Sequence, residues 1–258
     1  MTIANKLNKL LETKENIKQS IANKGVEITD DTVFAEYPAL IDSIEVGGGG
    51  NSYYEYLYNL RTNNGTNMSN MFYNCHSLTA LDASNFDTSN VTSMSSMFTN
   101  CTQLTELDLS NFNTSNVVDM SYMFSNCYNL YSLNVNNFII NTCDLIFMFE
   151  YCSALASLDL SNWNTSQVTN MNFMFRGCSN LWDLDIRNFD MSNIDYLYGM
   201  FKDCTQLAEL RLDNCSVDTV DKIINSSDFP ADNYGTIYCS WDVYYQLTPP
   251  GNWTFEAV

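Results

Sequence analysis

The dipeptide Met-Phe recurs six times along this chain at nearly constant spacing, and this period constrains the fold more than any other feature. The copies lie at Met71-Phe72, Met97-Phe98, Met123-Phe124, Met148-Phe149, Met174-Phe175 and Met200-Phe201, separated by 26, 26, 25, 26 and 26 residues. A period of about 20 to 50 residues is typical of units that bury their apolar face only by stacking on neighbouring copies. The sequence therefore predicts a solenoid.

The clearest repeat unit spans residues 97–122 and reads MFTNCTQLTELDLSNFNTSNVVDMSY. Its Leu-x-x-Leu-x-Leu segment alternates with period two, which predicts a short strand over residues 105–110. The polar stretch Asn113–Asn116 predicts a turn, and the apolar steps from Val117 to Phe124 predict one or two turns of helix. We therefore expect an α/β repeat solenoid with a parallel β-sheet on its concave face and short helices or turns opposite.

The repeat divides the chain into three parts. Residues 1–46 carry a heptad-like apolar spacing that predicts a small α-helical unit, either a self-packed hairpin or a docking and oligomerisation segment. Residues 47–52 form a glycine-rich linker. The solenoid then occupies 53–258, with an entry cap at 53–70 and an exit cap at 213–258, because the terminal apolar faces of a solenoid need cover.

Charge and hydropathy exclude two classes of partner. The chain has 30 acidic and 11 basic residues, a net charge of −19, so its field repels nucleic-acid phosphates. It contains no apolar run of about 18 or more residues and no recognisable secretion signal, so we expect no membrane insertion.

Six of the nine cysteines occupy one column of the repeat: Cys75, Cys101, Cys127, Cys152, Cys178 and Cys204. Side chains in such a column point the same way, so we expect a ladder of buried free thiols rather than disulfides. Metal binding is disfavoured because the chain has no Cys-x-x-Cys pair and a single histidine, His76.

The repeating unit F-x-x-C-x-x-L-x-x-L-x-L-x-x-F-x-T-S-x-V-x-x-M-x-x-M resembles the BspA-like leucine-rich repeats of bacterial surface proteins over about residues 53–225. That resemblance implies a surface-exposed binding or adhesion scaffold without catalytic residues to carry across. Residues 13–44 resemble the amino-terminal segments of bacteriophage tail and virion-appendage proteins, which implies attachment of a distal module to a particle.

A binding site is expected on the concave face, where residues between the inward strand positions point outward. The candidates are Glu106, Asp108, Tyr131, Asn134, Asp159, Trp182, Asp183 and Asp185. Acidic groups beside aromatic rings suit a cation, a basic partner or a polyhydroxylated ligand. The alternative is structural, because Asp before a Ser-Asn turn satisfies loop amides, and the turn residues Asn90, Asn116 and Asn193 suit capping better than ligand binding.

No catalytic motif, cofactor motif or metal-ligand pattern accompanies these residues, so we expect a non-enzymatic protein. The leading hypothesis is a phage virion appendage that attaches to virion structural proteins through residues 1–46, as a possible dimer or trimer. Its repeats would bind a host-surface protein or glycan. The alternatives are a structural virion decoration protein without a host ligand and an adhesin on the bacterial cell surface.

Overall fold

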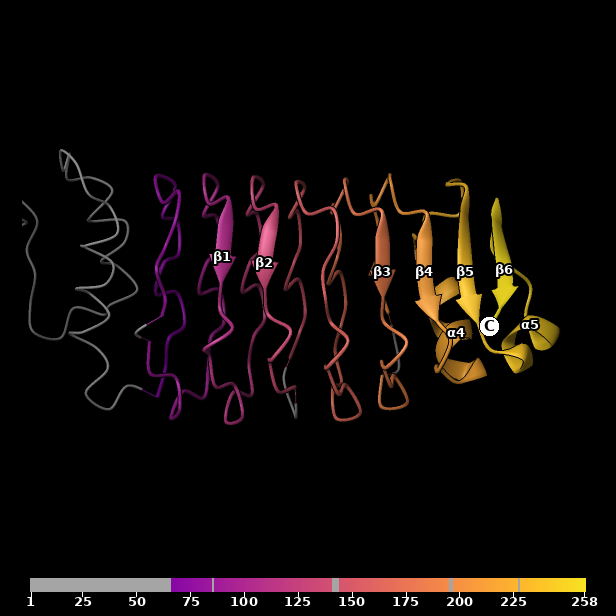
Figure 1. Ribbon diagram of the computed structural model, residues 1–258, viewed down its shortest axis with the longest axis horizontal. Coiled ribbons are helices and arrows are strands. Elements are labelled where there is room, and N and C mark those ends of the chain that lie inside the picture. Colours follow the sequence, from indigo (N-terminus) through magenta and orange to yellow (C-terminus); the bar gives the residue numbers. More distant parts are fainter. Residues whose placement is uncertain (1–65, 85, 141–143, 195–196, 227) are drawn as a thin grey trace, which may run out of the picture.

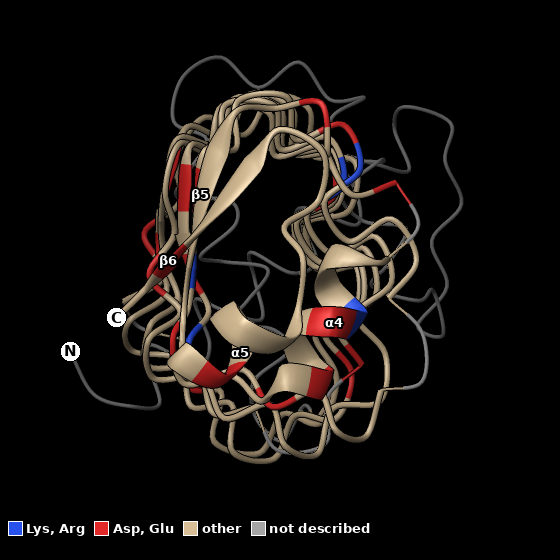
Figure 2. Cartoon of the chain, turned by 90° about the vertical axis from the view of Figure 1, so that its right-hand side faces the viewer, with Lys and Arg blue, Asp and Glu red and all other residues tan. Residues whose placement is uncertain are grey.

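The computed structural model describes residues 66–84, 86–140, 144–194, 197–226 and 228–258. Within these ranges the chain forms coils stacked along one axis, with the strands side by side on one face (Figure 1). Viewed along that axis the coils overlie one another (Figure 2), so the sheet face is nearly flat rather than concave. The predicted helical unit 1–46 and the linker 47–52 lie outside the described residues.

The strands are short and parallel, as the alternating leucines predict. β1 (Glu106–Asp108) pairs with β2 (Ser132–Asn134), and a second sheet has the order β3 (Asp183–Asp185), β4 (Glu209–Leu212), β5 (Gly235–Cys239) and β6 (Trp253–Ala257). In β1 the side chain of Leu107 is buried between exposed Glu106 and Asp108. An isolated parallel bridge joins Asp159 to Asp185 between the two sheets. Equivalent residues of successive coils therefore lie in register across the sheet face.

The helix predicted opposite the sheet is wrong in the described repeats, which have consecutive tight turns there. Tyr122 and Asn126, four residues apart, both adopt left-handed backbone conformations with φ of 57° and 62°. Between them, the amide of Met123 donates within its own turn, to the carbonyl of Met120 (3.2 Å), whereas the amide of Phe124 donates to Met148 of the next coil (2.9 Å). Because alternate amides point to the next coil, the i to i−4 pattern of an α-helix does not form.

Helices occupy that side of the described chain only near its end. α4 (Val217–Ile224) begins at Ser216, whose side chain accepts a hydrogen bond from the amide of Thr219, and α5 (Trp241–Gln246) begins at Ser240 in the same way. In Figure 2 α4 lies across the coil from β5 and β6, whereas α5 lies at the lower end of the coil and contacts β6. These last coils extend the parallel sheet while replacing the tight turns with regular helix.

The core consists of columns of identical side chains, one member per coil. The Met-Phe phenylalanines stack in parallel, with ring centroids of Phe98 and Phe124 5.7 Å apart and an interplanar angle of 3°. Beside them the Cys127 thiol donates to the carbonyl oxygen of Phe98 at 3.1 Å, and burial raises its pKa to about 12. All eight described cysteines are buried and free, which confirms the thiol ladder.

Polar side chains at the turns form hydrogen bonds between successive coils. The buried Thr114 hydroxyl accepts from the amide of Ile139 (2.7 Å) and donates to its carbonyl (3.2 Å). The side-chain amide of Asn116 donates to the carbonyl of Ser89 at 2.8 Å, and Asn193 makes the equivalent bond to Ser166. These bonds confirm the capping interpretation for Asn116 and Asn193.

Candidate functional site

The structure places all eight candidate residues on the sheet face. Glu106 and Asp108 lie on β1, Asn134 on β2, Asp183 and Asp185 on β3, Tyr131 and Trp182 directly before β2 and β3, and Asp159 at the bridge to Asp185. Parallel pairing in register aligns these positions along the solenoid axis. Successive coils of a sheet lie about 4.8 Å apart, so a ligand larger than one residue would contact several coils.

The column of aspartates closes the turns that follow the strands. An Asp108 oxygen accepts from the amide of Ser110 at 2.9 Å, and an Asp159 oxygen accepts from the amide of Ser161 at 3.0 Å. The amide and side chain of Ser110 lower the pKa of Asp108, and the side chain and amide of Ser161 lower that of Asp159, because these hydrogen bonds stabilise the charged form. The structural interpretation of these aspartates is therefore confirmed, and each carries a second oxygen that this turn bond does not use.

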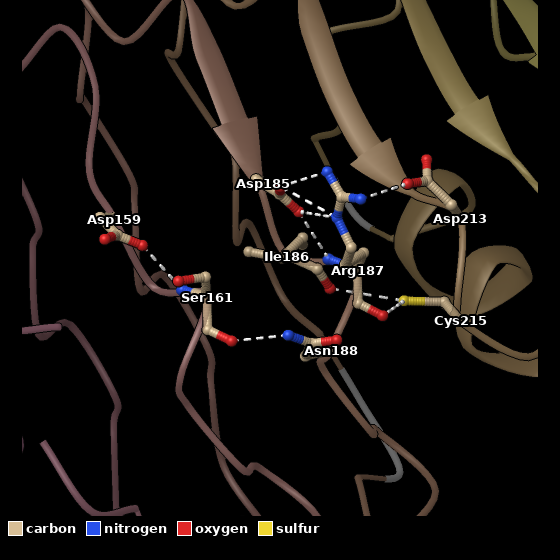
Figure 3. A network of polar contacts seen from close by, with 8 residues as sticks. All are labelled: Asp159, Ser161, Asp185, Ile186, Arg187, Asn188, Asp213 and Cys215. Carbon is tan, nitrogen blue, oxygen red and sulfur yellow. Dashed lines mark hydrogen bonds and ion pairs between the residues drawn. The ribbon is translucent and has the colours of Figure 1, made fainter. Parts of the chain in front are cut away.

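Toward the carboxyl-terminal end of the face, an arginine neutralises one member of the aspartate column, Asp185 (Figure 3). Arg187 forms ion pairs with Asp185 (2.6 Å) and Asp213 (3.1 Å). Partial burial acts to raise the pKa of Asp185, but the hydrogen bonds and charge of Arg187 lower it overall. The guanidinium of Arg211 lies 4.5 Å from the ring centroid of Tyr238. Arg187 was not considered in the expectations from sequence, and it reduces the negative charge of the face in these coils.

The amino-terminal half of the face holds an open depression of about 420 Å³. Its lining residues are Ala80, Leu81, Glu106, Leu107, Asp108, Ser132 and Asn134. The Tyr131 hydroxyl donates to the Glu106 carboxylate, and this bond raises the pKa of Tyr131. Because the Tyr131 side chain is 54% exposed, its ring stands beside the depression and remains accessible.

The structure therefore divides the candidates into two groups. Glu106, Asp108 and Asn134 line the depression, with Tyr131 beside it. Asp159, Asp183 and Asp185 lie in later coils, as does Trp182, whose side chain is 50% exposed.

The two exposed aromatic residues are separated by one intervening coil. Ala156 occupies the same position as Tyr131 and Trp182 in that coil, and its carbonyl accepts from the amide of Trp182 at 3.0 Å. Tyr131 and Trp182 are consequently two coils apart, about 10 Å along the axis. Each ring therefore stands alone over the sheet.

Sequence reasoning missed a second surface, on the turns opposite the strands. Tyr122, Phe147 and Phe173 precede the Met-Phe pair in three consecutive repeats, and their rings stack on one another. The signal was present as three successive aromatic-Met-Phe triplets. It was not used because the turns were expected to be helical.

Two other features concern the described part of the chain alone. Among those residues, no three His, Cys, Asp or Glu side chains are arranged as metal ligands. The helices within the described ranges are all too short or too polar to cross a bilayer.

Comparisons with known proteins found a family and a solved structure that are similar to this chain. The family described as "Mycoplasma protein of unknown function, DUF285" matches residues 50–144 and 134–229. The chain is similar to a crystal structure of a leucine-rich repeat protein of T. pallidum, TpLRR, with a TM-score of 0.37 and 18% identity. That alignment covers 64% of this chain and 64% of the length of that protein. No curated protein matches significantly.

The family match supports the BspA-like leucine-rich repeat resemblance seen in the repeating unit. The two matched segments overlap and together span more than half of the chain, including the six Met-Phe copies. The parallel strands and stacked coils fit a leucine-rich repeat fold with few helices. The chain belongs to the family of Mycoplasma proteins of unknown function, DUF285.

Proposed function

We propose that the protein is a non-enzymatic binding module whose sheet-face depression contacts a glycan or protein on a cell surface. The observation that carries this proposal is the exposed Tyr131 ring, held by its hydroxyl to Glu106 at the side of the depression. Leucine-rich repeat families of this kind are typically binding modules rather than enzymes.

The residues of the depression suit a polyhydroxylated ligand. The carboxylates of Glu106 and Asp108 accept hydroxyl protons, and the side-chain amide of Asn134 both donates and accepts. The ring of Tyr131 offers an apolar surface against which the C–H face of a sugar packs. No Lys or Arg lines the depression, so an anionic ligand is disfavoured.

In the fuller form of the proposal the protein is a phage virion appendage. Residues 1–46 would attach it to virion structural proteins, as a dimer or trimer, and assembly in the host cytoplasm would precede release by lysis. This form rests on the resemblance of residues 13–44 to appendage segments. Light scattering of the full chain tests the oligomer, because a monomer at every concentration would contradict it.

A bacterial surface adhesin is the second candidate, and the family description favours it because it names Mycoplasma, a cellular organism. Both candidates use the same depression and differ in what residues 1–46 attach to. Fractionation of the source cells, or of a phage lysate, with an antibody against the full chain separates them. Protein in purified particles supports the virion, and protein on intact cells supports the adhesin.

The test of the binding site uses the labelled full chain on a glycan array and a panel of bacterial cells. Tyr131→Thr is the matched substitution, because Thr105 occupies the same position one coil earlier. Tyr234→Thr, at a residue 82% exposed and distant in sequence, is the control. We expect at least tenfold weaker binding for Tyr131→Thr, about 1.4 kcal/mol, and no change for the control.

Two results would contradict the proposal. Equal binding by Tyr131→Thr and the wild-type protein would show that the ligand does not bind at the depression. Failure of the folded wild-type protein to bind any sugar or cell would favour a structural decoration protein, which covers a particle without a host ligand.

A further inference from the structure

A stack of three aromatic rings runs along the turns opposite the strands, with Tyr122 exposed and Phe147 and Phe173 partly buried. The ring centroids of Tyr122 and Phe147 are 4.8 Å apart, and those of Phe147 and Phe173 are 4.9 Å apart, with interplanar angles of 19° and 9°. All three residues have positive φ, between 55° and 58°. Asn70 and Gly199 occupy the same position in other coils and adopt this conformation at lower cost. The rings are thus present despite a local backbone preference for smaller residues.

The stack is closed at one end and open at the other. Past Phe173 the next coil has Gly199, where an added Cβ would lie only 2.5 Å from the Phe173 ring. The ring therefore covers the backbone of Gly199. Before Tyr122 the corresponding residue is Ser96, which has no ring to continue the stack. One face of Tyr122 consequently ends the stack toward Ser96, and its side chain is 37% exposed.

The electrostatic surroundings of Tyr122 favour a cation. Desolvation raises the pKa of its hydroxyl, and the carboxylates of Glu150 and Asp144 raise it further. Asp144 is half-buried, and its carboxylate accepts from the amide of Ile146 at 2.9 Å, which holds it at the turn. The protein as a whole carries a charge of −19, so its long-range field also attracts basic groups.

The chain already contains an arginine in this kind of environment. The guanidinium carbon of Arg176 lies 5.6 Å from the Phe173 ring centroid and 5.2 Å from that of Tyr151. Its Nη1 pairs with one oxygen of Glu150 at 3.3 Å. The other oxygen of Glu150 accepts from the hydroxyl of Ser125 at 3.1 Å, and Ser125 belongs to the coil of Tyr122. Glu150 thus lies in the coil between those of Arg176 and Tyr122.

We propose that the open end at Tyr122 binds an arginine side chain of a partner protein. The guanidinium would stack on the free face of the Tyr122 ring, and the negative charges of Asp144 and Glu150, in the next coil, would add to its attraction. Arginine suits this place better than lysine, because its planar, weakly hydrated cation stacks on aromatic rings. This surface lies across the coil from the depression beside Tyr131, so it would serve a second partner.

Fluorescence anisotropy with the full chain tests the proposal. The probe is a fluorescein-labelled peptide, Gly-Gly-Arg-Gly-Gly-Arg-Gly-Gly, in about 0.15 M salt, where long-range attraction is largely screened. Analogues with lysine, citrulline or tryptophan at both arginine positions are measured in parallel. We expect the arginine peptide to bind at least tenfold more tightly than the lysine peptide, and the neutral citrulline peptide to lose binding.

Two substitutions locate the site. Ser96→Phe should extend the stack by one ring and occupy the free face of Tyr122, and the same coil position already accepts Phe147 and Phe173. Tyr122→Asn introduces the residue found at Asn70 and removes the ring. We expect each to weaken binding of the arginine peptide at least tenfold, while the control Tyr234→Asn leaves it unchanged.

Three results would overturn the proposal. Unchanged binding by Ser96→Phe, shown by circular dichroism to be folded, would exclude the open end of the stack even if Tyr122→Asn failed to fold. Equal binding of arginine and lysine peptides would indicate attraction to the net charge alone. Tighter binding of the tryptophan peptide would indicate an aromatic rather than a cationic partner.

Discussion

The buried thiol column predicts that this protein loses stability in mild alkali. Cys127 is fully buried, and its pKa is raised from 9.0 to about 12 because burial disfavours the thiolate. A group with a raised pKa in the folded state contributes its full stability below the unfolded value, here about pH 9. That contribution is lost as the pH rises toward 12, because the unfolded chain releases protons that the folded chain retains.

The magnitude follows from the proton linkage. At pH 10, one unit above the unfolded pKa, each such thiol lowers the free energy of unfolding by about 1.4 kcal/mol. Cys152 and Cys178 have pKa values raised well above 9.0, and that of Cys204 is about 12. Together with Cys127 these thiols remove about 6 kcal/mol at pH 10, which is comparable with the whole stability of an ordinary domain.

Urea unfolding of wild-type protein and of Cys127→Ala, at pH 7.5 and pH 10 with a non-thiol reductant, measures this effect through tryptophan fluorescence. At pH 7.5 we expect the substitution to cost about 1 to 2 kcal/mol, from lost packing and the lost bond to Phe98. At pH 10 its cost should shrink by about 1.4 kcal/mol. Thr102→Ala, on a partly exposed loop, should show no such change. The same cost of Cys127→Ala at both pH values would refute the buried neutral thiol.

Three further predictions concern the turns and the caps. Gly177→Ala should lower the melting temperature, because φ is +71° and the new Cβ would overlap the Tyr151 ring; calorimetry showing no change would contradict this packing. Thr114→Val should lower the free energy of unfolding in urea by about 2 to 4 kcal/mol, because the amide and carbonyl of Ile139 both lose their hydrogen-bond partner. A loss below about 0.5 kcal/mol would contradict the contribution of these two hydrogen bonds. The lowered pKa of Asp159 stabilises the fold above about pH 4, and this stability is lost in more acid solution. Asp159→Asn should therefore flatten the acid limb of a thermal-melting profile, and an unchanged limb would exclude the turn bond.

The stacked coils and their core were predictable because the period is a direct consequence of burial. Each apolar column requires the same side chain once per coil, so the recurrence of Phe124 and Cys127 in other repeats identifies them as core residues. The strand over Leu107 follows from alternation, since one side of the sheet faces the core. These features depend on spacing, which a sequence displays fully.

The turns were not predictable from apolar spacing, because steps of three and four residues suit a helix and a series of tight turns equally well. The distinguishing signal is asparagine at Asn100 and Asn126, since asparagine tolerates left-handed backbone better than most residues. Aromatic residues at Phe147 and Phe173 obscured this signal. They adopt the same conformation, although single-residue preference argues against it.

The candidate site was predicted in position but only partly in character. The repeat register predicted Glu106 and Asn134 together on the sheet face. It also predicted that Tyr131, beside them, is exposed, as the structure shows. Neutralisation of Asp185 by Arg187 was missed, because it depends on how the long side chain of Arg187, two residues past β3, folds back onto the end of that strand. The docking function of residues 1–46 stays a prediction.

The central claim is that the sheet face binds a ligand at the depression beside Tyr131. Amide hydrogen exchange of the full chain tests this claim most directly. Exchange is measured with and without the glycan of the array that binds the protein most tightly. The account predicts slower exchange in β1 and β2 and in the residues that flank them, with unchanged exchange in α5 of the exit cap. Protection confined to other coils, or to the turns that carry Tyr122 and Phe147, would contradict it.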